Sequence, residues 1–268
     1  MDNRPIGIFD SGVGGLTVAK EIMTMLPNEN IIYFGDTARV PYGSKSKETI
    51  VRFSMQIIRF LLTKSVKAIV IACNTASAYA LEEVSSMFDV PIIGVHLPGA
   101  AETAVKVTSN KKIGIIGTEG TIHSNIYHQY IHRIMPEADV IGRACPLFVP
   151  LVEEGLIDDC VTYEIANRYL SILKEKGVDT LVLGCTHYPL IKDTIQKVMG
   201  DSVSLINPAS ETAKTLKNLL KEKNTINNQI GTDYDFYVSD RAEKWEQFAK
   251  RILNRGMVPV KQINIEEF

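Results

Sequence analysis

Residues 181–189 read LVLGCTHYP, and residues 69–76 repeat their pattern as IVIACNTA. In both stretches an apolar run stops at a small residue and is followed by a cysteine and then by hydrogen-bonding side chains. Continuous apolar runs of this kind predict buried strands of a parallel sheet, and the polar residues mark the turn where a helix begins. Open α/β sheets bind their ligands at such turns. We therefore expect Cys73 and Cys185 to lie at the ligand-binding ends of two similar units.

A second pair of similar segments supports an internal duplication. IGIFDS at residues 6–11 matches IGIIGT at residues 113–118. Strands and helices alternate along the chain, which predicts an α/β fold of two pseudo-symmetric domains, each a mostly parallel sheet flanked by helices. We assign residues 1–97 and 208–268 to the first domain and 98–207 to the second, because the closing segment has no counterpart in the second half. The active site is then expected at the domain interface.

Two local predictions concern the second half of the chain. The turn at residues 117–120 is followed by one predicted helix that runs to about Ile134. Residues 145–155 contain Pro146, Pro150 and Gly155, and this composition predicts a loop.

The composition limits the kinds of partner. Of the 268 residues, 29 are basic and 31 acidic, so no strong field attracts nucleic acid or an anionic membrane. The four cysteines form no Cys-x-x-Cys pair, which suits free thiols in a reducing compartment. The N-terminus lacks the features of a signal peptide, and no apolar run approaches the ~20 residues of a membrane span. We expect a soluble cytoplasmic protein that binds a small molecule, with no nucleic-acid or membrane partner, and we expect a homodimer.

Two thiols suit a reaction that removes a proton from one face of a carbon and returns one to the other face. A thiol with a reference pKa of ~8.5 can act as base or acid near neutral pH when a charge or a helix N-terminus is close. Proton transfer is most efficient when the pKa lies near the working pH. Cys73 and Cys185 would exchange these roles with the direction of reaction, whereas Cys145 and Cys160 are assigned to core or inert positions.

Each of the two reactive thiols has a candidate helper nearby. Asp10 ends the strand predicted to lie beside the strand of Cys73, and His187 lies two positions after Cys185. A cationic imidazole favours a thiolate, while a carboxylate opposes it or accepts its proton. Asp10 could instead cap the first helix, and the sequence leaves both roles open.

Polar residues at the strand-to-helix turns outline a pocket the size of an amino acid. The turn at residues 12–15 (GVGG) offers backbone N–H groups to a carboxylate, but Thr17 stands where a dinucleotide fingerprint needs glycine. Hydroxyl and amide groups at these turns can converge on carboxylates. The pocket residues are Ser11, Asn74, Thr75 and Thr186, with Tyr42, Gly43 and Ser44 closing the far side.

Four segments together resemble the glutamate racemases, cofactor-independent enzymes of bacterial cell-wall synthesis. They are DSGVGG at 10–15, GDTARVPYG at 35–43, ACNTA at 72–76 and GCTHYPL at 184–190. The resemblance covers nearly the whole chain and implies that Cys73 removes the α-proton of D-glutamate and Cys185 that of L-glutamate. It also implies substrate contacts at Asp10, Ser11, Tyr42, Gly43, Asn74, Thr75, Thr186 and His187, with Glu153 as an auxiliary group.

The same resemblance implies that the product is D-glutamate for peptidoglycan, and that no pyridoxal phosphate, metal or nucleotide is required. One position departs from the pattern, since Ser77 stands where many relatives would have threonine.

Three other functions compete with this one. A racemase of the same fold could act on aspartate or a hydantoin. Cys73, Cys185, His187 and Asp10 would also make a tetrahedral zinc set for a hydrolase. A sensor that binds an amino acid without converting it would keep the crevice, although it would not need both thiols.

Overall fold

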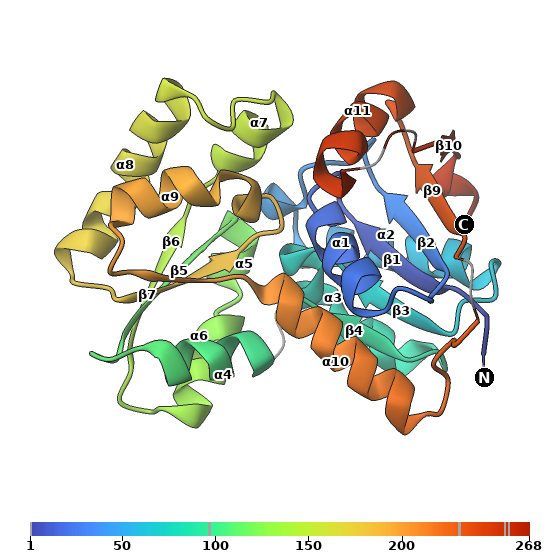
Figure 1. The fold of residues 1–268 in the computed structure, drawn as a ribbon, viewed down its shortest axis with the longest axis horizontal. Helices are drawn as coiled ribbons and strands as arrows, with labels where there is room; N and C mark the ends of the chain where they lie inside the picture. Colours follow the sequence, from blue (N-terminus) through green and yellow to red (C-terminus); the bar gives the residue numbers. More distant parts are fainter. Residues whose placement is uncertain (1, 96–97, 230–231, 255, 257) are drawn as a thin grey trace. The chain divides into compact units, whose positions relative to one another are not determined.

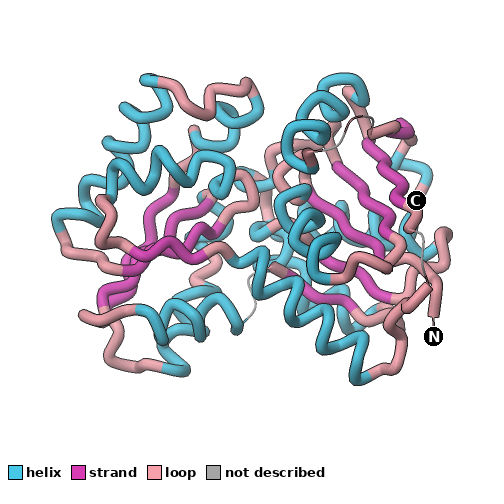
Figure 2. Tube along the Cα trace, viewed as in Figure 1, coloured by secondary structure: helices cyan, strands magenta, loops and turns pink. Residues whose placement is uncertain are grey.

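The computed structural model describes residues 2–95, 98–229, 232–254, 256 and 258–268. The chain divides into two compact units, Met1–Val95 with Ala209–Phe268 as unit 1 and His96–Pro208 as unit 2. Each unit is a sheet with helices on both faces (Figures 1 and 2). The fold class predicted from the alternating pattern is confirmed.

Unit 1 is built on a six-stranded parallel sheet in the order β10-β9-β2-β1-β3-β4. Its strands are β1 (Ile6–Asp10), β2 (Ile31–Gly35), β3 (Ala68–Ile71), β4 (Ile92–Gly94), β9 (Tyr234–Val238) and β10 (Val260–Gln262). Its helices are α1 (Leu16–Met25), α2 (Lys47–Leu62), α3 (Asn74–Met87), α10 (Pro208–Glu222) and α11 (Ala242–Leu253), with short 3-10 turns η1 (Tyr42–Ser44) and η3 (Ile265–Glu267). The closing segment of the chain thus extends the sheet of unit 1 beyond β2.

Unit 2 is built on a four-stranded parallel sheet in the order β6-β5-β7-β8. Its strands are β5 (Lys112–Gly117), β6 (Asp139–Ala144), β7 (Thr180–Gly184) and β8 (Ser204–Ile206). Its helices are α4 (Pro98–Val107), α5 (Glu119–His123), α6 (Ile126–Ile134), α7 (Phe148–Glu153), α8 (Cys160–Glu175) and α9 (Lys192–Met199), with the 3-10 turn η2 (Tyr188–Ile191).

The central strands are apolar because helices cover both of their faces. Every residue of β1, β2, β3 and β7 is buried. In unit 2, Leu181 and Leu183 pack into one core with residues of α7, α8 and α9, while Val182 packs into another with residues of α4 and α6. Burial of both faces explains why these strands show continuous apolar runs rather than alternation.

Four neighbouring strands of the first sheet follow the same order as the four strands of the second, as expected for the predicted duplication. β2-β1-β3-β4 in unit 1 corresponds to β6-β5-β7-β8 in unit 2. In each sheet the chain leaves the first strand toward one neighbour and later returns on the other side of it. The carboxyl ends of β1 and β3, and of β5 and β7, therefore flank a point where the strand order reverses, which is where open α/β sheets bind ligands.

The structure corrects two of the local predictions. The predicted loop at 145–155 contains the helix α7, because Pro150 lies in its first turn, where no backbone N–H is needed, and Phe148 and Val152 are buried. The helix predicted to run to about Ile134 is two helices, α5 and α6, separated at Asn125, whose φ is 54°. No helix in the described ranges combines the length and apolarity needed to cross a bilayer.

A buried ion pair anchors the returning chain at the amino ends of the strands of unit 1. Lys67 Nζ lies 2.6 Å from Glu29 Oε2, and the two side chains are 0% and 1% exposed. The ammonium also donates to the carbonyl oxygens of Asp2 and Thr225, each at 2.7 Å. The backbone N–H of Asn227 donates to the other carboxylate oxygen of Glu29 at 2.9 Å. The pair therefore joins the N-terminus, the sheet and the segment after α10.

We predict that Lys67→Met lowers the free energy of unfolding of unit 1 by about 3–5 kcal/mol, because Glu29 is left charged and buried without its partner. Trp245, the single tryptophan of the chain, lies in this unit and reports its urea-induced unfolding by fluorescence. Lys250→Met is the control, since its pair with Glu246 is 41% and 29% exposed and is worth less than about 1 kcal/mol. Equal unfolding transitions for the two variants would contradict the prediction.

Candidate active site

Asp10 and Cys73 lie at the carboxyl ends of neighbouring strands in unit 1. β1 pairs with β3 in register, Phe9 opposite Ile71, and the N–H of Ala72 donates to the carbonyl of Phe9 at 2.7 Å. Asp10 is the last residue of β1, and Cys73, two positions after the end of β3, is the N-cap residue of α3. Strand pairing therefore brings together two side chains that are 63 positions apart in the sequence.

The glycine-rich turn after β1 binds the carboxylate of Asp10. The backbone N–H groups of Gly12 and Gly15 donate to Asp10 Oδ2 at 3.1 and 2.9 Å, and Asp10 is fully buried. Gly15 is the N-cap residue of α1, so Asp10 satisfies a donor at the start of this helix. These two N–H groups, which the sequence suggested for a ligand, thus serve a carboxylate of the chain itself.

The thiol of Cys73 lies at the N-terminus of α3. Its Sγ donates to Ser11 Oγ at 3.8 Å, and the residue is only 6% exposed. The partial positive charge at a helix N-terminus acts on a sulfur in this position. Asn74 and Thr75 follow Cys73 in the sequence, form the first turn of α3 and are buried. This group of residues is called the first half-site, and it contains a thiol, a hydroxyl, a carboxylate and two further polar side chains. Its members are Asp10, Ser11, Cys73, Asn74 and Thr75.

A second loop of unit 1 carries Tyr42, Gly43 and Ser44 in η1, which packs against α3. The hydroxyl of Tyr42 donates to Asp36 Oδ2, and Arg39 Nε donates to the same oxygen at 2.7 Å. Burial and the Asp36 carboxylate raise the pKa of the Tyr42 hydroxyl, which is therefore neutral. Gly43 is half-buried and Ser44 is exposed.

Asp36 was not predicted as a functional residue. It is fully buried and also accepts a hydrogen bond from Ser239 Oγ at 2.9 Å. The available signal was its position directly after a buried strand, in a polar loop that includes Tyr42.

Cys185, His187 and Glu153 form a continuous set of contacts in unit 2. Cys185 follows β7, and its Sγ lies 3.8 Å from His187 Nδ1. His187 Nε2 lies 3.1 Å from Glu153 Oε1, and Glu153 is the last residue of α7. The helix that the sequence did not predict thus supplies the auxiliary carboxylate, which is placed against the imidazole rather than against the thiol.

His187 is held as a cation despite being buried. Burial lowers the pKa of its imidazole, but hydrogen bonding and charge interaction with Cys185 and with Glu153 outweigh burial and raise the pKa to about 10. The side chain is 3% exposed and that of Glu153 is 23% exposed. At neutral pH a positive charge therefore lies beside the sulfur of Cys185, next to the buried Thr186.

The first half-site and the group Cys185, Thr186, His187 and Glu153, called the second half-site, lie at equivalent strand ends but contain different ionisable side chains. Asp10 and Gly117 occupy the corresponding last positions of β1 and β5, so unit 2 has no carboxylate at that strand end. The ionisable side chain beside the thiol of unit 2 is instead His187, which lies after β7. The sequence places His187 two positions after Cys185, and the two side chains are in contact, whereas the thiol of Cys73 contacts Ser11.

The other two cysteines lie in different surroundings. Cys145 is fully buried, and burial raises the pKa of its thiol, whereas Cys160 is exposed at the start of α8 rather than in the core. All four cysteines are free. Among the residues that the structure describes, no three His, Cys, Asp or Glu side chains are arranged to hold a metal ion.

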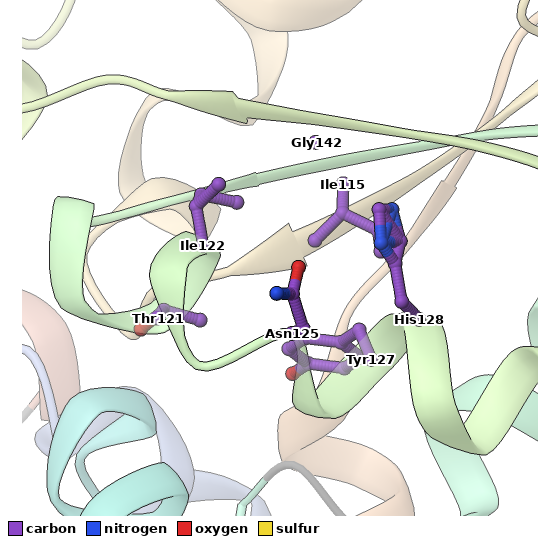
Figure 3. A pocket seen from close by; sticks show the side chains of 7 residues that line it. All are labelled: Ile115, Thr121, Ile122, Asn125, Tyr127, His128 and Gly142. Atoms are coloured by element: carbon purple, nitrogen blue, oxygen red, sulfur yellow. The ribbon is translucent and has the colours of Figure 1, made fainter.

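Unit 2 also contains a small cavity between its sheet and the helices α5 and α6 (Figure 3). Its volume is about 10 Å³, which suffices for one water molecule. None of the predicted site residues lines it. The lining residues are Ile115, Thr121, Ile122, Asn125, Tyr127, His128 and Gly142.

Comparison with known proteins shows what the whole chain is similar to. The model of the Asp/Glu/hydantoin racemase family matches residues 14–216. Glutamate racemase of Geobacter metallireducens is 49% identical, covering 99% of this chain and 98% of the relative. The crystal structure of glutamate racemase isoform RacE1 from Bacillus anthracis has a TM-score of 0.93 at 38% identity, with 98% of each chain covered.

A second solved structure includes a ligand. Glutamate racemase from Francisella tularensis in complex with D-glutamate has a TM-score of 0.92 at 41% identity, with 100% of both chains covered. The resemblance inferred from four short segments is confirmed. The chain therefore belongs to the Asp/Glu/hydantoin racemase family and is an isomerase acting on amino acids, like the glutamate racemases that it matches over its full length.

Proposed function

We propose that this protein interconverts L- and D-glutamate by a two-base mechanism in which Cys73 and Cys185 act on the same α-carbon. The observation that carries the proposal is the equivalent placement of the two thiols, each just past the carboxyl end of a strand that flanks a reversal of strand order. The binding of D-glutamate by the Francisella tularensis relative supports the choice of substrate.

In the proposed reaction one thiolate removes the α-proton, and the other thiol protonates the opposite face. With D-glutamate, Cys73 takes the proton and becomes a thiol, while the electron pair of the C–H bond moves into the α-carboxylate. Cys185 then gives its own proton to the carbon and becomes a thiolate. With L-glutamate the two cysteines exchange roles, so no oxidant, reductant or other reactant is consumed.

The helpers supply the charges that each thiol needs. The imidazolium of His187 stabilises a thiolate at Cys185, and Glu153 maintains the charge of His187. On the other side, Asp10 acts with Cys73 as the carboxylate that opposes a permanent thiolate or accepts its proton. Two groups with different helpers can therefore be base and acid in the same resting state.

The polar residues around the thiols bind the substrate in this proposal. Hydroxyl and amide groups fixed before the reaction can stabilise the negative charge that develops on the α-carboxylate without having to reorganise. The residues proposed for substrate contact are Asp10, Ser11, Tyr42, Gly43, Ser44, Asn74, Thr75, Thr186 and His187. We further propose that the D-glutamate is used for peptidoglycan in the cytoplasm and that the protein is a homodimer.

Exchange of the α-proton with solvent tests the two-base scheme. In deuterium oxide, at low conversion from either pure enantiomer, we expect deuterium in the newly formed enantiomer and protium in the recovered substrate. This is because each thiol delivers a proton derived from solvent to its own face. Mass spectrometry after chiral separation measures both pools. Equal labelling of substrate and product would contradict the proposal, and a parallel panel with aspartate and hydantoins would identify a different substrate.

Removal of either thiol tests the roles of the two cysteines. We expect Cys73→Ala and Cys185→Ala each to reduce kcat by roughly 10²-fold to 10⁴-fold in both directions, the usual contribution of a general acid or base. Circular dichroism of D- and L-glutamate mixtures measures the turnover. Cys160→Ala is the matched control because its thiol is exposed, and it should keep normal turnover. Near-normal turnover by either of the other two variants would refute the scheme.

Substitution of Glu153 tests the charge on His187. In Glu153→Gln we expect the pKa of His187 to fall below its value of about 10, because one of the groups that raise it is neutralised. A cation exists only below its pKa, so the alkaline limit of activity should move to lower pH. NMR titration of isotope-labelled histidine and the pH dependence of kcat measure both effects. Glu154→Gln, at the exposed neighbouring position, should change neither.

A further inference from the structure

Two buried aromatic side chains hold the carbonyl group of Gly12 in unit 1. The hydroxyl of Tyr33 donates to this oxygen at 3.1 Å, and the indole Nε1 of Trp245 donates to it at 3.3 Å. Tyr33 is 0% exposed on β2, and Trp245 is 1% exposed on α11. A single carbonyl thus receives one donor from the sheet and another from the closing segment of the chain.

Gly12 connects these donors directly to Asp10. Its N–H donates to Asp10 Oδ2 at 3.1 Å, while its carbonyl is the group that Tyr33 and Trp245 hold. The position of one residue therefore determines where a donor to the carboxylate lies. Rotation of the peptide units around Gly12 would move the N–H away from Asp10.

The packing around Gly12 leaves no room for a side chain at two neighbouring glycines. A Cβ on Gly35 would lie 2.6 Å from the Gly12 oxygen and 2.9 Å from Trp245 Nε1. A Cβ on Gly15 would lie 2.4 Å from the Cβ of Asp10 and 2.8 Å from the Tyr33 hydroxyl oxygen. Real Cβ atoms do not occur at such distances, so the bare glycines are what allow the carbonyl, the indole and the carboxylate to come this close.

The indole ring packs against two aromatic neighbours. Its centroid lies 5.6 Å from that of Tyr33 and 5.5 Å from that of Phe236, both in tilted contacts. α11 also packs against α1, the helix that begins after the glycine-rich turn. These contacts bury the ring, and the hydrogen bond to Gly12 sets the direction of its N–H.

We propose that Trp245 and Tyr33 are positioning residues that fix Asp10 for proton transfer at Cys73, acting through the carbonyl of Gly12. The inference rests on the proposed function, in which Asp10 assists Cys73 and not Cys185. Its physical basis is the steep dependence of proton transfer on the placement of the participating groups, where a misplacement of about 1 Å can cost ~10²-fold in rate. A helix from the last sixty residues of the chain thereby serves the first half-site alone.

Trp245→Phe and Tyr33→Phe test the proposal, because each removes one donor and keeps an aromatic ring. Phe236→Leu is the control, since it alters a ring contact of Trp245 but removes no hydrogen bond. We expect kcat to fall about 10-fold to 100-fold in each donor variant. The two glutamate enantiomers have equal free energies, so kcat/KM must fall equally in both directions and cannot reveal which half-site is affected.

Isotope effects on kcat/KM reveal which half-site is affected. With α-deuterated D-glutamate the labelled bond is broken by Cys73, and with α-deuterated L-glutamate by Cys185. If the Cys73 step becomes slower, the isotope effect from D-glutamate rises and that from L-glutamate falls relative to the unmodified protein. We expect this opposite shift in Trp245→Phe and Tyr33→Phe, and wild-type isotope effects in Phe236→Leu.

The other outcomes overturn the proposal. Unchanged isotope effects in both donor variants, with or without a loss of turnover, would show that the contacts are structural only. The same shift in Phe236→Leu would assign the effect to packing. Should Trp245→Phe not fold, Tyr33→Phe decides the matter. This variant keeps Trp245, the single tryptophan, whose fluorescence checks that the indole stays buried. Failure of the proposed function itself would be distinguishable, because unmodified protein would then show either no α-proton exchange or equal labelling of substrate and product.

Discussion

The parallel pairing of the strands is the constraint on which the rest of this structure depends. Parallel strands require a crossover after each strand, so all their carboxyl ends lie at one edge of the sheet. Because the chain goes from β1 to one side and returns on the other, the loops after β1 and β3 diverge and leave polar side chains between them. Asp10 and Cys73 lie there, and unit 2 places Cys185 at the equivalent point.

Each half-site contains a buried ionisable side chain, and the two side chains have different hydrogen-bond partners. A buried ionised group is stable only when it is paired or hydrogen-bonded. Oδ2 of Asp10 accepts from backbone N–H groups of the turn that follows it, which come from the same stretch of chain. His187 is satisfied by the side chain of Glu153 from a separate helix. The repeated scaffold therefore carries different ionisable groups in its two units.

The closing segment makes unit 1 more than a copy of unit 2. β9 pairs with β2, and the residues after it contact both loops of the first half-site. Ser239 donates to Asp36, which in turn accepts from Tyr42, and Trp245 donates to Gly12. No strand of the described part of unit 2 extends its sheet beyond β6 in this way. The added strands and the helix α11 thus fix the positions of the two loops on which substrate binding is proposed to depend.

The sequence by itself determined the buried strands, the duplication and the two cysteines, because each follows from the pattern of a few consecutive residues. His187 was found for the same reason, two positions after Cys185. Only the tertiary structure decided that α7 is a helix, that Glu153 meets an imidazole 34 positions away, and that Trp245 meets Gly12 across 233 positions. Contacts of this kind depend on the order of strands in the sheet and on the direction of each crossover, and no local pattern of residues encodes either.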